Sequence, residues 1–245
     1  MKDERWKDFF DETYASFSEV ILTPERTVAE CEAIIDCLQL QTGDHVLDFG
    51  CGQGRMSIPL AERGMTVTGY DGSPTLLEEA KRRAPDLPHL HFQLGDMREL
   101  DESEQYDAII NIGTAFGYVP SREEDEHILQ RVYAALKPGG YFLQELENRE
   151  NKIKQLYPTW NVMHNNIVFS RRQFDLTTSR WSEEMFWFEE QEKKQAKLEL
   201  TLYTASELMH MTTSAGLQVQ HIYGGLDRSS YHMDSPRLMI LSQKK

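Results

Sequence analysis

The chain has 245 residues, of which 40% are apolar, and its formal net charge is −14 at neutral pH. This length and apolar content suffice for one large domain or for one domain with an insertion. The acidic charge disfavours sequence-independent binding to nucleic acid or to an anionic membrane, because both depend on clustered basic side chains.

The N-terminus and the cysteines restrict the class of protein further. The first ten residues, MKDERWKDFF, lack the apolar stretch of a signal peptide. No run approaches the roughly 18 apolar residues of a membrane span, so we expect a cytoplasmic protein. Three cysteines without a CxxC pair argue against both a disulfide framework and a zinc cluster, and no metal site is expected.

Strand and helix patterns alternate through the first 147 residues. Helices are expected to begin at Thr23-Pro24, Ser73-Pro74 and Ser121, because each offers a capping side chain, followed by proline in the first two and by Glu124 in the third. The predicted strands are HVLDFG (45–50), TVTGYD (66–71), LHFQLGD (90–96), YDAIINIG (106–113) and YFLQELE (141–147). This alternation predicts a parallel sheet with helices on both faces.

The pattern changes from Asn148. Residues 148–203 contain three segments of alternating apolar and polar side chains without a helix between them, which predicts a three-stranded antiparallel insertion. Thr204 and Glu207 then form a capping box that begins a helix, and two further strands follow it. We therefore expect a core formed by residues 1–147 and 204–245, with 148–203 inserted as a substrate cover or a dimer contact.

The stretch VLDFGCGQG, at 46–54, predicts a ligand site. A strand that runs through glycines into a helix presents bare amides at the carboxyl edge of a parallel sheet, where ligands bind. The spacing G-x-G-x-G differs from the G-x-G-x-x-G of dinucleotide folds. Asp48 would repel a pyrophosphate but attract the ammonium group of an amino acid.

This pattern resembles the D/E-x-G-x-G-x-G motif of class I S-adenosylmethionine-dependent methyltransferases. Asp71 ends the second strand, where a carboxylate can accept the ribose hydroxyls, a feature that NAD folds share. Asp96-Met97, after the third strand, looks like the acid and apolar residue that contact adenine in the family. The resemblance covers most of residues 40–147 plus the terminal helix and strands, and it implies a Rossmann-like seven-stranded sheet whose last strand is antiparallel.

The resemblance also implies a set of cofactor-binding residues. Cys51 is expected to contribute a backbone amide rather than a nucleophile, and Tyr14 to lie in an N-terminal segment that closes over the cofactor. The complete expected set is Tyr14, Asp48, Gly50, Cys51, Gly52, Gly54, Asp71, Gly72, Asp96, Met97 and Asn111.

The fourth strand bears on the acceptor. Its NIGTAFGY segment lacks the Pro-Pro-Tyr motif of amine methyltransferases that act on nucleic acid, and it resembles small-molecule enzymes, including sugar-amine N-methyltransferases. Aromatic residues of the insertion could cover a substrate or form a homodimer contact. Catalytic bases are not assigned. The candidates are His164, His221, His232, Glu145 and Glu147, and Arg228 and Tyr231 are expected near the ligand edge.

Together these features favour a methyltransferase that uses S-adenosylmethionine and acts on the nitrogen or oxygen of a small molecule. One alternative is a non-catalytic domain that binds the same cofactor and interacts with proteins through its aromatic insertion. A protein or RNA methyltransferase is another, since an acidic enzyme can carry a local basic groove. An NAD-dependent oxidoreductase is the least favoured, because the glycine spacing and Asp96 do not match it.

Overall fold

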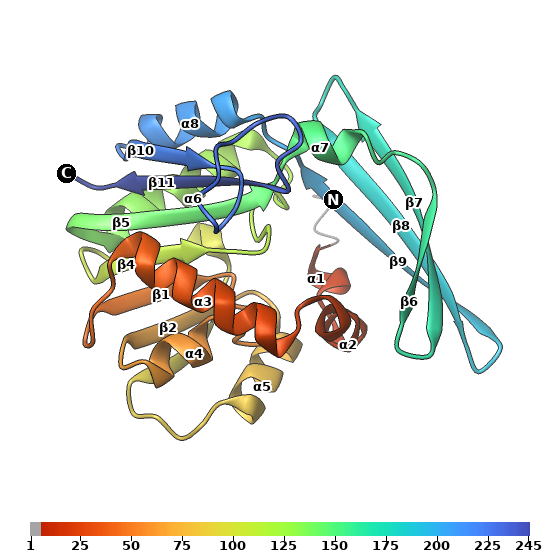
Figure 1. Cartoon of the computed structure of the whole chain (residues 1–245), viewed down its shortest axis with the longest axis horizontal. Coiled ribbons are helices and arrows are strands. Elements are labelled where there is room, and N and C mark those ends of the chain that lie inside the picture. The colour runs from red at the N-terminus through yellow and green to blue at the C-terminus, as the bar shows by residue number, and fades with distance from the viewer. Residues whose placement is uncertain (1–5) are drawn as a thin grey trace.

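A computed structural model describes residues 6–245, which form two β-sheets flanked by helices (Figure 1). The larger sheet has the strand order β10-β11-β5-β4-β1-β2-β3. Strand β11 runs antiparallel to both neighbours, and the other pairs are parallel. Its strands are β1 (His45–Phe49), β2 (Thr66–Asp71), β3 (Leu90–Leu94), β4 (Tyr106–Asn111), β5 (Leu136–Glu147), β10 (Gln218–Tyr223) and β11 (Arg237–Gln243). The predicted Rossmann-like sheet is confirmed.

Helices cover both faces of this sheet, as the sequence predicts. Apolar side chains of α3 (Pro24–Leu38) and α4 (Ser57–Glu62) pack on one face, and those of α6 (Arg122–Ala135) and α8 (Ala205–Ser214) pack on the other. The remaining helices are α1 (Trp6–Phe9), α2 (Glu12–Ile21), α5 (Pro74–Arg83), α7 (Arg149–Ile153) and the 3-10 helix η1 (Met97–Glu99). Within residues 6–245, none of these helices has the length and apolar content to cross a bilayer.

The predicted helix starts are confirmed by the capping hydrogen bonds. Thr23, Ser73 and Ser121 each accept a backbone N–H of the first turn of α3, α5 and α6. Thr204 and Glu207 form a reciprocal capping box at α8. These caps satisfy backbone donors that helix geometry leaves unpaired, so local sequence fixes where four major helices begin.

The second sheet is antiparallel and has four strands rather than the three predicted. Its strands, in spatial order, are β6 (Thr159–Met163), β7 (Asn166–Asp175), β8 (Arg180–Glu189) and β9 (Glu192–Thr201). The additional strand is β6, whose Trp160 and Val162 are more than half exposed. Because β6 is a short edge strand with little buried surface, its sequence carries a weak alternation signal.

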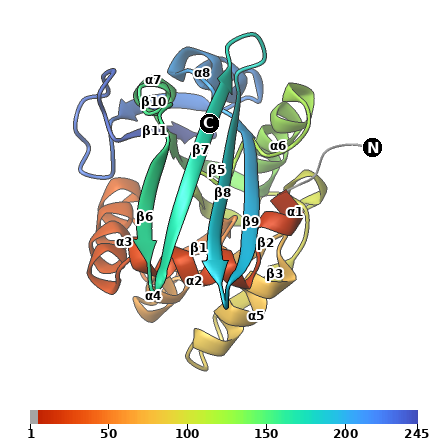
Figure 2. The same cartoon turned by 90° about the vertical axis from the view of Figure 1, so that its right-hand side faces the viewer.

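The second sheet lies over the carboxyl edge of the core strands β1, β4 and β5 (Figures 1 and 2). Residues 6–22, which include α1 and α2 and which we call the N-terminal strap, lie between the two sheets (Figure 1). Phe17 of the strap contacts Trp187 of β8 with ring centroids 5.2 Å apart, and His164 lies 2.9 Å from the Ser16 carbonyl oxygen. The strap therefore links the core to the second sheet.

Candidate active site

The glycine turn after β1 adopts the conformation that its sequence predicts. Gly50, Gly52 and Gly54 have φ angles of 90°, 55° and 78°, a region that side chains disfavour. A Cβ atom on Gly50 would lie 2.4 Å from the Ala115 Cβ and 2.8 Å from the Met97 Cε. The turn can thus bring its backbone close to Ala115 and Met97 only because position 50 has no side chain.

Asp71 connects the glycine turn to the end of β2. Its Oδ2 atom accepts the Gly52 N–H at 2.7 Å, and its Oδ1 atom accepts the Ser73 N–H at 2.8 Å. Burial raises the pKa of Asp71, and the backbone hydrogen bonds oppose that rise. Each carboxylate oxygen can accept a second hydrogen bond, so Asp71 can also bind a pair of hydroxyl groups.

Asp96 is held at the end of β3 by its neighbours. The Tyr70 hydroxyl donates to the Asp96 carbonyl oxygen at 2.9 Å, and the Arg98 guanidinium binds both carboxylate oxygens at 2.9 and 2.5 Å. Desolvation raises the pKa of Asp96, but Arg98 outweighs it and the net shift is downward. Asp96 is therefore a fixed anion beside Met97.

Three of the expected cofactor residues do not line the cavity described below: Asp48, Gly54 and Asn111. The Asp48 carboxylate is 2% exposed and accepts the Ser57 hydroxyl at 2.6 Å. Burial raises the pKa of Asp48 to about 6, although the Ser57 hydrogen bond opposes the rise. The Asn111 amide donates to the Phe49 carbonyl oxygen at 2.6 Å. Asp48 and Asn111 thus support the turn from below.

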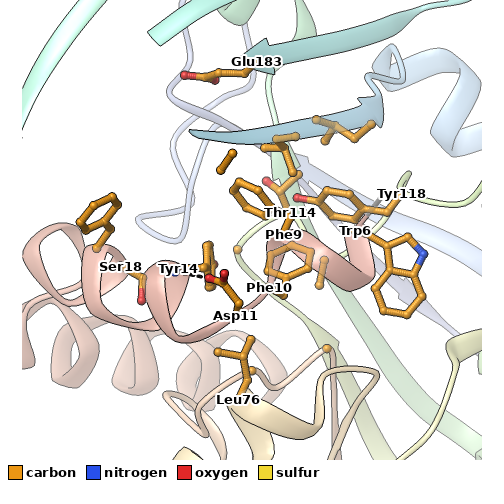
Figure 3. A pocket seen from close by; sticks show the side chains of 18 of the residues that line it. Trp6, Phe9, Phe10, Asp11, Tyr14, Ser18, Leu76, Thr114, Tyr118 and Glu183 are labelled. Atoms are coloured by element: carbon orange, nitrogen blue, oxygen red, sulfur yellow. Dashed lines mark hydrogen bonds between the residues drawn. The ribbon is translucent and has the colours of Figure 1, made fainter. Parts of the chain in front are cut away.

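One cavity of about 900 Å³ extends from the glycine turn to the inner face of the second sheet. This volume is at the upper end of ligand sites and leaves room for a cofactor and a second small molecule. Figure 3 shows that its lining side chains come from the strap, from the loop after β4 and from the second sheet. Of the expected residues, those that line it are Tyr14, Gly50, Cys51, Gly52, Asp71, Gly72, Asp96 and Met97.

Known proteins are similar to this chain in sequence. Residues 46–140 match the family model described as a methyltransferase domain. The glycine/sarcosine N-methyltransferase of Aphanothece halophytica is 25% identical over 99% of this chain and 92% of its own. A ubiquinone biosynthesis O-methyltransferase of Coxiella burnetii is 34% identical over 45% of this chain and 46% of its own.

Solved structures share the fold over nearly the whole chain. The CcbJ methyltransferase of Streptomyces caelestis superimposes with a TM-score of 0.85 at 20% identity, covering 99% of both chains. The sugar N-methyltransferase KedS8 of Streptoalloteichus superimposes with a TM-score of 0.77 at 17% identity, covering 96% of this chain and 94% of its own. The chain is an S-adenosylmethionine-dependent methyltransferase.

The cavity of this methyltransferase fits its cofactor chemically. S-adenosylmethionine carries an amino-acid group, two ribose hydroxyls and an adenine, and the cavity offers the backbone of the glycine turn, the Asp71 carboxylate and the Asp96–Met97 pair. The Cys51 side chain is buried, and burial raises its pKa well above the usual range. Since a neutral thiol is a poor nucleophile, a backbone role suits Cys51 better than a covalent one.

Tyr14 of the methyltransferase lies on α2 and faces the cavity (Figure 3). Burial raises the pKa of its phenol, as does the negative charge of Asp71, whereas Arg55 and Arg237 lower it. Tyr118, from the loop after β4, has its pKa raised mainly by burial and also by Tyr14 and Glu147. Both side chains line the cavity, Tyr14 from the strap and Tyr118 from the loop after β4.

A charged cluster lies at this junction, and the sequence predicts only part of it. Arg237 at the start of β11 pairs with Glu145 at 2.8 Å and with Glu147 at 3.2 Å. Lys152 of α7 pairs with Glu147 at 3.2 Å. Tyr118, Lys152 and Arg237 were not predicted, because three separate loops and strand ends bring them together. Tyr118 and Lys152 follow the carboxyl ends of β4 and β5, and Arg237 begins the antiparallel strand β11 at the same edge of the sheet.

The second sheet presents a mixed inner face to the cavity. Its buried Trp181 and Trp187 line the cavity, and Arg172 pairs with Glu183 at 3.0 Å between them. The aromatic residues Trp160, Phe169 and Phe188 instead lie exposed on the outer face.

None of the eight histidines lines the cavity within residues 6–245. Tyr231, expected near the ligand edge, binds Asn148 and Glu150 outside it, and Arg228 does not line it.

Proposed function

We propose that this methyltransferase methylates a nitrogen atom of a small, polar molecule bound between the second sheet and the glycine turn. The observation that carries the proposal is the single cavity that joins the glycine turn to a face of tryptophan and paired charges. The fold shared with a sugar N-methyltransferase and the similarity to a glycine/sarcosine N-methyltransferase support a small acceptor.

The cofactor-binding roles follow from the placement of the acids. We assign the ribose hydroxyls to Asp71, the adenine to Asp96 and Met97, and the methionine part to the backbone of the turn at Gly50, Cys51 and Gly52. Asp48 acts through its charge beneath the turn, toward the ammonium group, rather than by direct contact. Gly54 and Asn111 maintain the shape of the turn. Tyr14 covers the cofactor from the strap.

An amine acceptor suits the groups around the junction. S-adenosylmethionine supplies an electrophilic methyl group on a sulfonium. The acceptor nitrogen attacks with its lone pair as the carbon–sulfur bond breaks, and the nitrogen then loses its proton. A neutral amine needs no base before attack, which fits a cavity without histidine. Arg237 and Lys152 outweigh the desolvation that raises the pKa of Glu147, and the net shift is downward. Glu147 therefore stays anionic and can orient an ammonium or amine N–H.

The acceptor panel that tests this proposal pairs amines with their hydroxyl analogues. Purified enzyme is incubated with S-adenosylmethionine and amino sugars, amino acids and the matched hydroxyl compounds, and methylated products are detected by mass spectrometry. Products from amines alone support the proposal. Products from hydroxyl compounds alone, from proteins or RNA alone, or cofactor binding without any product would contradict it.

The outer face of the second sheet supports a second proposal, a homodimer. Trp160, Phe169 and Phe186 form one cross-strand row, and Val162 and Ile167 pair beside Phe188. We call these six residues the outer patch. Five of them are at least 38% exposed, and a contiguous apolar surface of this kind marks interaction sites.

The charges around the outer patch favour a second copy of this chain as its partner. The charged side chains around the patch on this face are three cations, Arg171, Lys193 and Lys197, and two anions, Glu184 and Glu199. Arg171 pairs with Glu184, and Lys197 pairs with Glu199. Three cations and two anions leave this face nearly neutral in a chain of net charge −14. Two acidic copies would therefore repel each other least when they meet here, through a self-complementary two-fold contact.

A further inference from the structure

Gly72 leaves a bare position directly after Asp71, beside the proposed ribose site. Its φ is not in the left-handed range, so the backbone there does not require glycine. A Cβ atom on Gly72 would instead lie 2.7 Å from two carbon atoms, Cη2 and Cζ3, of the Trp6 indole. The indole of the strap thus occupies the space in which a side chain at position 72 would lie.

The same indole faces the cavity. Trp6 lines it together with Gly72, Gly95, Asp96 and Met97, so open space remains between the ring and the end of β3. Its Nε1–H group is buried and has no hydrogen-bond partner within residues 6–245. Figure 3 shows Trp6 on α1 beside Tyr118, away from Glu183 of the second sheet. Trp6 therefore borders the nucleoside end of the cavity and not the acceptor end.

Contacts on both sides hold this part of the strap in place. The Ser73 hydroxyl donates to the Phe10 carbonyl oxygen at 2.7 Å, and the Gln53 amide donates to the Ser18 hydroxyl at 3.2 Å. The Phe10 ring packs edge-on against Tyr118 at 5.3 Å. Because Ser73 and Gln53 belong to the two loops that flank the proposed nucleoside site, the indole is fixed relative to that site.

We infer that Trp6 forms the aromatic wall on which the adenine stacks, in place of a side chain at position 72. This inference rests on the proposed nucleoside placement at Asp71 and Asp96. A planar indole offers a large stacking surface to a purine, and its unpaired N–H offers a donor to the bound nucleoside. The strap then contributes directly to cofactor affinity, rather than only excluding water.

The test is calorimetric titration with S-adenosylhomocysteine. Trp6→Ala should weaken binding roughly 5- to 100-fold, the range of losing one stacked base. Trp6→Phe should retain part of the affinity. The double variant Trp6→Ala/Gly72→Leu should recover part of it, because a leucine can fill the vacated space. Val20→Ala, in the same strap but outside the cavity, is the matched control and should bind as the wild type does.

The outcomes separate failure of this inference from failure of the proposed function. Unchanged affinity in Trp6→Ala alongside a loss in Asp71→Ala would overturn the role of Trp6 and leave the proposed function intact. Tighter binding in Trp6→Ala would mean that the indole obstructs the site, and it would overturn the inference as well. If the wild type binds no S-adenosylhomocysteine, both proposals fail. Quenching or enhancement of tryptophan fluorescence by the ligand should occur in the wild type and diminish in Trp6→Phe.

Discussion

The Gly52 N–H donates to the Asp71 carboxylate over 2.7 Å, which joins the glycine turn of β1 to the end of β2. The carboxylate that we assign to the ribose therefore also holds the backbone of the turn that we assign to the methionine part. Since Asp71 accepts the Ser73 N–H with its other oxygen, it links the turn to the start of α5 too. Cofactor affinity and local stability should consequently depend on the same residues.

Gly50→Ala should destabilise the fold severely. The variant combines a φ of 90° with a Cβ 2.4 Å from that of Ala115, so we expect a loss of about 2–5 kcal/mol in the free energy of unfolding, from strain and overpacking. Gly113→Ala is the matched control, because its φ is 79° but nothing lies within 4 Å of the added atom. It should lose only about 1–2 kcal/mol. Urea denaturation measures both, and equal losses would contradict this explanation.

The buried carboxylate of Asp48 should make the stability depend on pH. Its folded pKa, about 6, lies above the unfolded value of about 3.9. The folded state therefore holds this proton more tightly, and the stabilisation is fully present below pH about 3.9 and lost as the pH rises through 6. Relative to Asp48→Asn, the wild type should lose about 2 kcal/mol between pH 4 and pH 7.

Urea denaturation of the wild type and Asp48→Asn at both pH values measures this difference directly. Asp125, whose pKa burial raises to about 7, is present in both proteins and cancels in the comparison. If the unfolding free energy of Asp48→Asn changes with pH in the same way as that of the wild type, Asp48 does not cause the effect. If the wild type instead gains stability relative to the variant as the pH rises, the predicted direction of the pH dependence is wrong.

Glu147→Gln should impair the acceptor and spare the cofactor. Removing the negative charge at the junction should raise the KM for an amine roughly 10- to 100-fold, the effect of losing one charge-assisted hydrogen bond. The affinity for S-adenosylhomocysteine should stay unchanged. Glu150→Gln, which alters a carboxylate outside the cavity, should leave both constants unchanged. A cofactor affinity that falls together with acceptor binding would argue against this division of the cavity.

The outer patch should control association. We expect wild-type protein to elute with the mass of a dimer in size-exclusion chromatography with light scattering, and Trp160→Ser/Phe188→Ser to elute as a monomer. Both residues are more than half exposed in the single chain, so the double variant should fold normally. A monomeric wild type, or a dimeric variant, would show that a second copy does not cover this face.

Local signals in the sequence predicted most of the core. Thr23-Pro24 and Ser73-Pro74 marked helix starts because a cap and a proline act within one turn, and the strand 66–71 matches β2 residue for residue. Strand β5 begins at Leu136, five residues before the predicted start at 141. Leu136 pairs with Tyr106 and Tyr141 pairs with Ala108, so the KPGG segment between them forms an irregularity within the strand that its glycine-rich sequence does not reveal.

The sequence could not predict which of the site residues line the cavity and which lie buried beneath the glycine turn. Asp48 and Asp71 both lie in buried strands of the core, yet Asp48 points beneath the turn and Asp71 into the cavity. The pattern of a strand predicts its faces but not the path of the loop that covers one of them. Likewise, Trp6 and Gly72 are 66 residues apart, and only the packing of the strap brings them together.

Titration of S-adenosylhomocysteine into the wild type, Asp71→Ala and Asp71→Asn tests the central claim most directly, because Asp71 links the turn to the proposed ribose site. We predict saturable binding to the wild type and at least roughly tenfold weaker binding to both variants. Absence of binding to the wild type at millimolar ligand, or equal affinity in all three folded proteins, would contradict the assignment of the site.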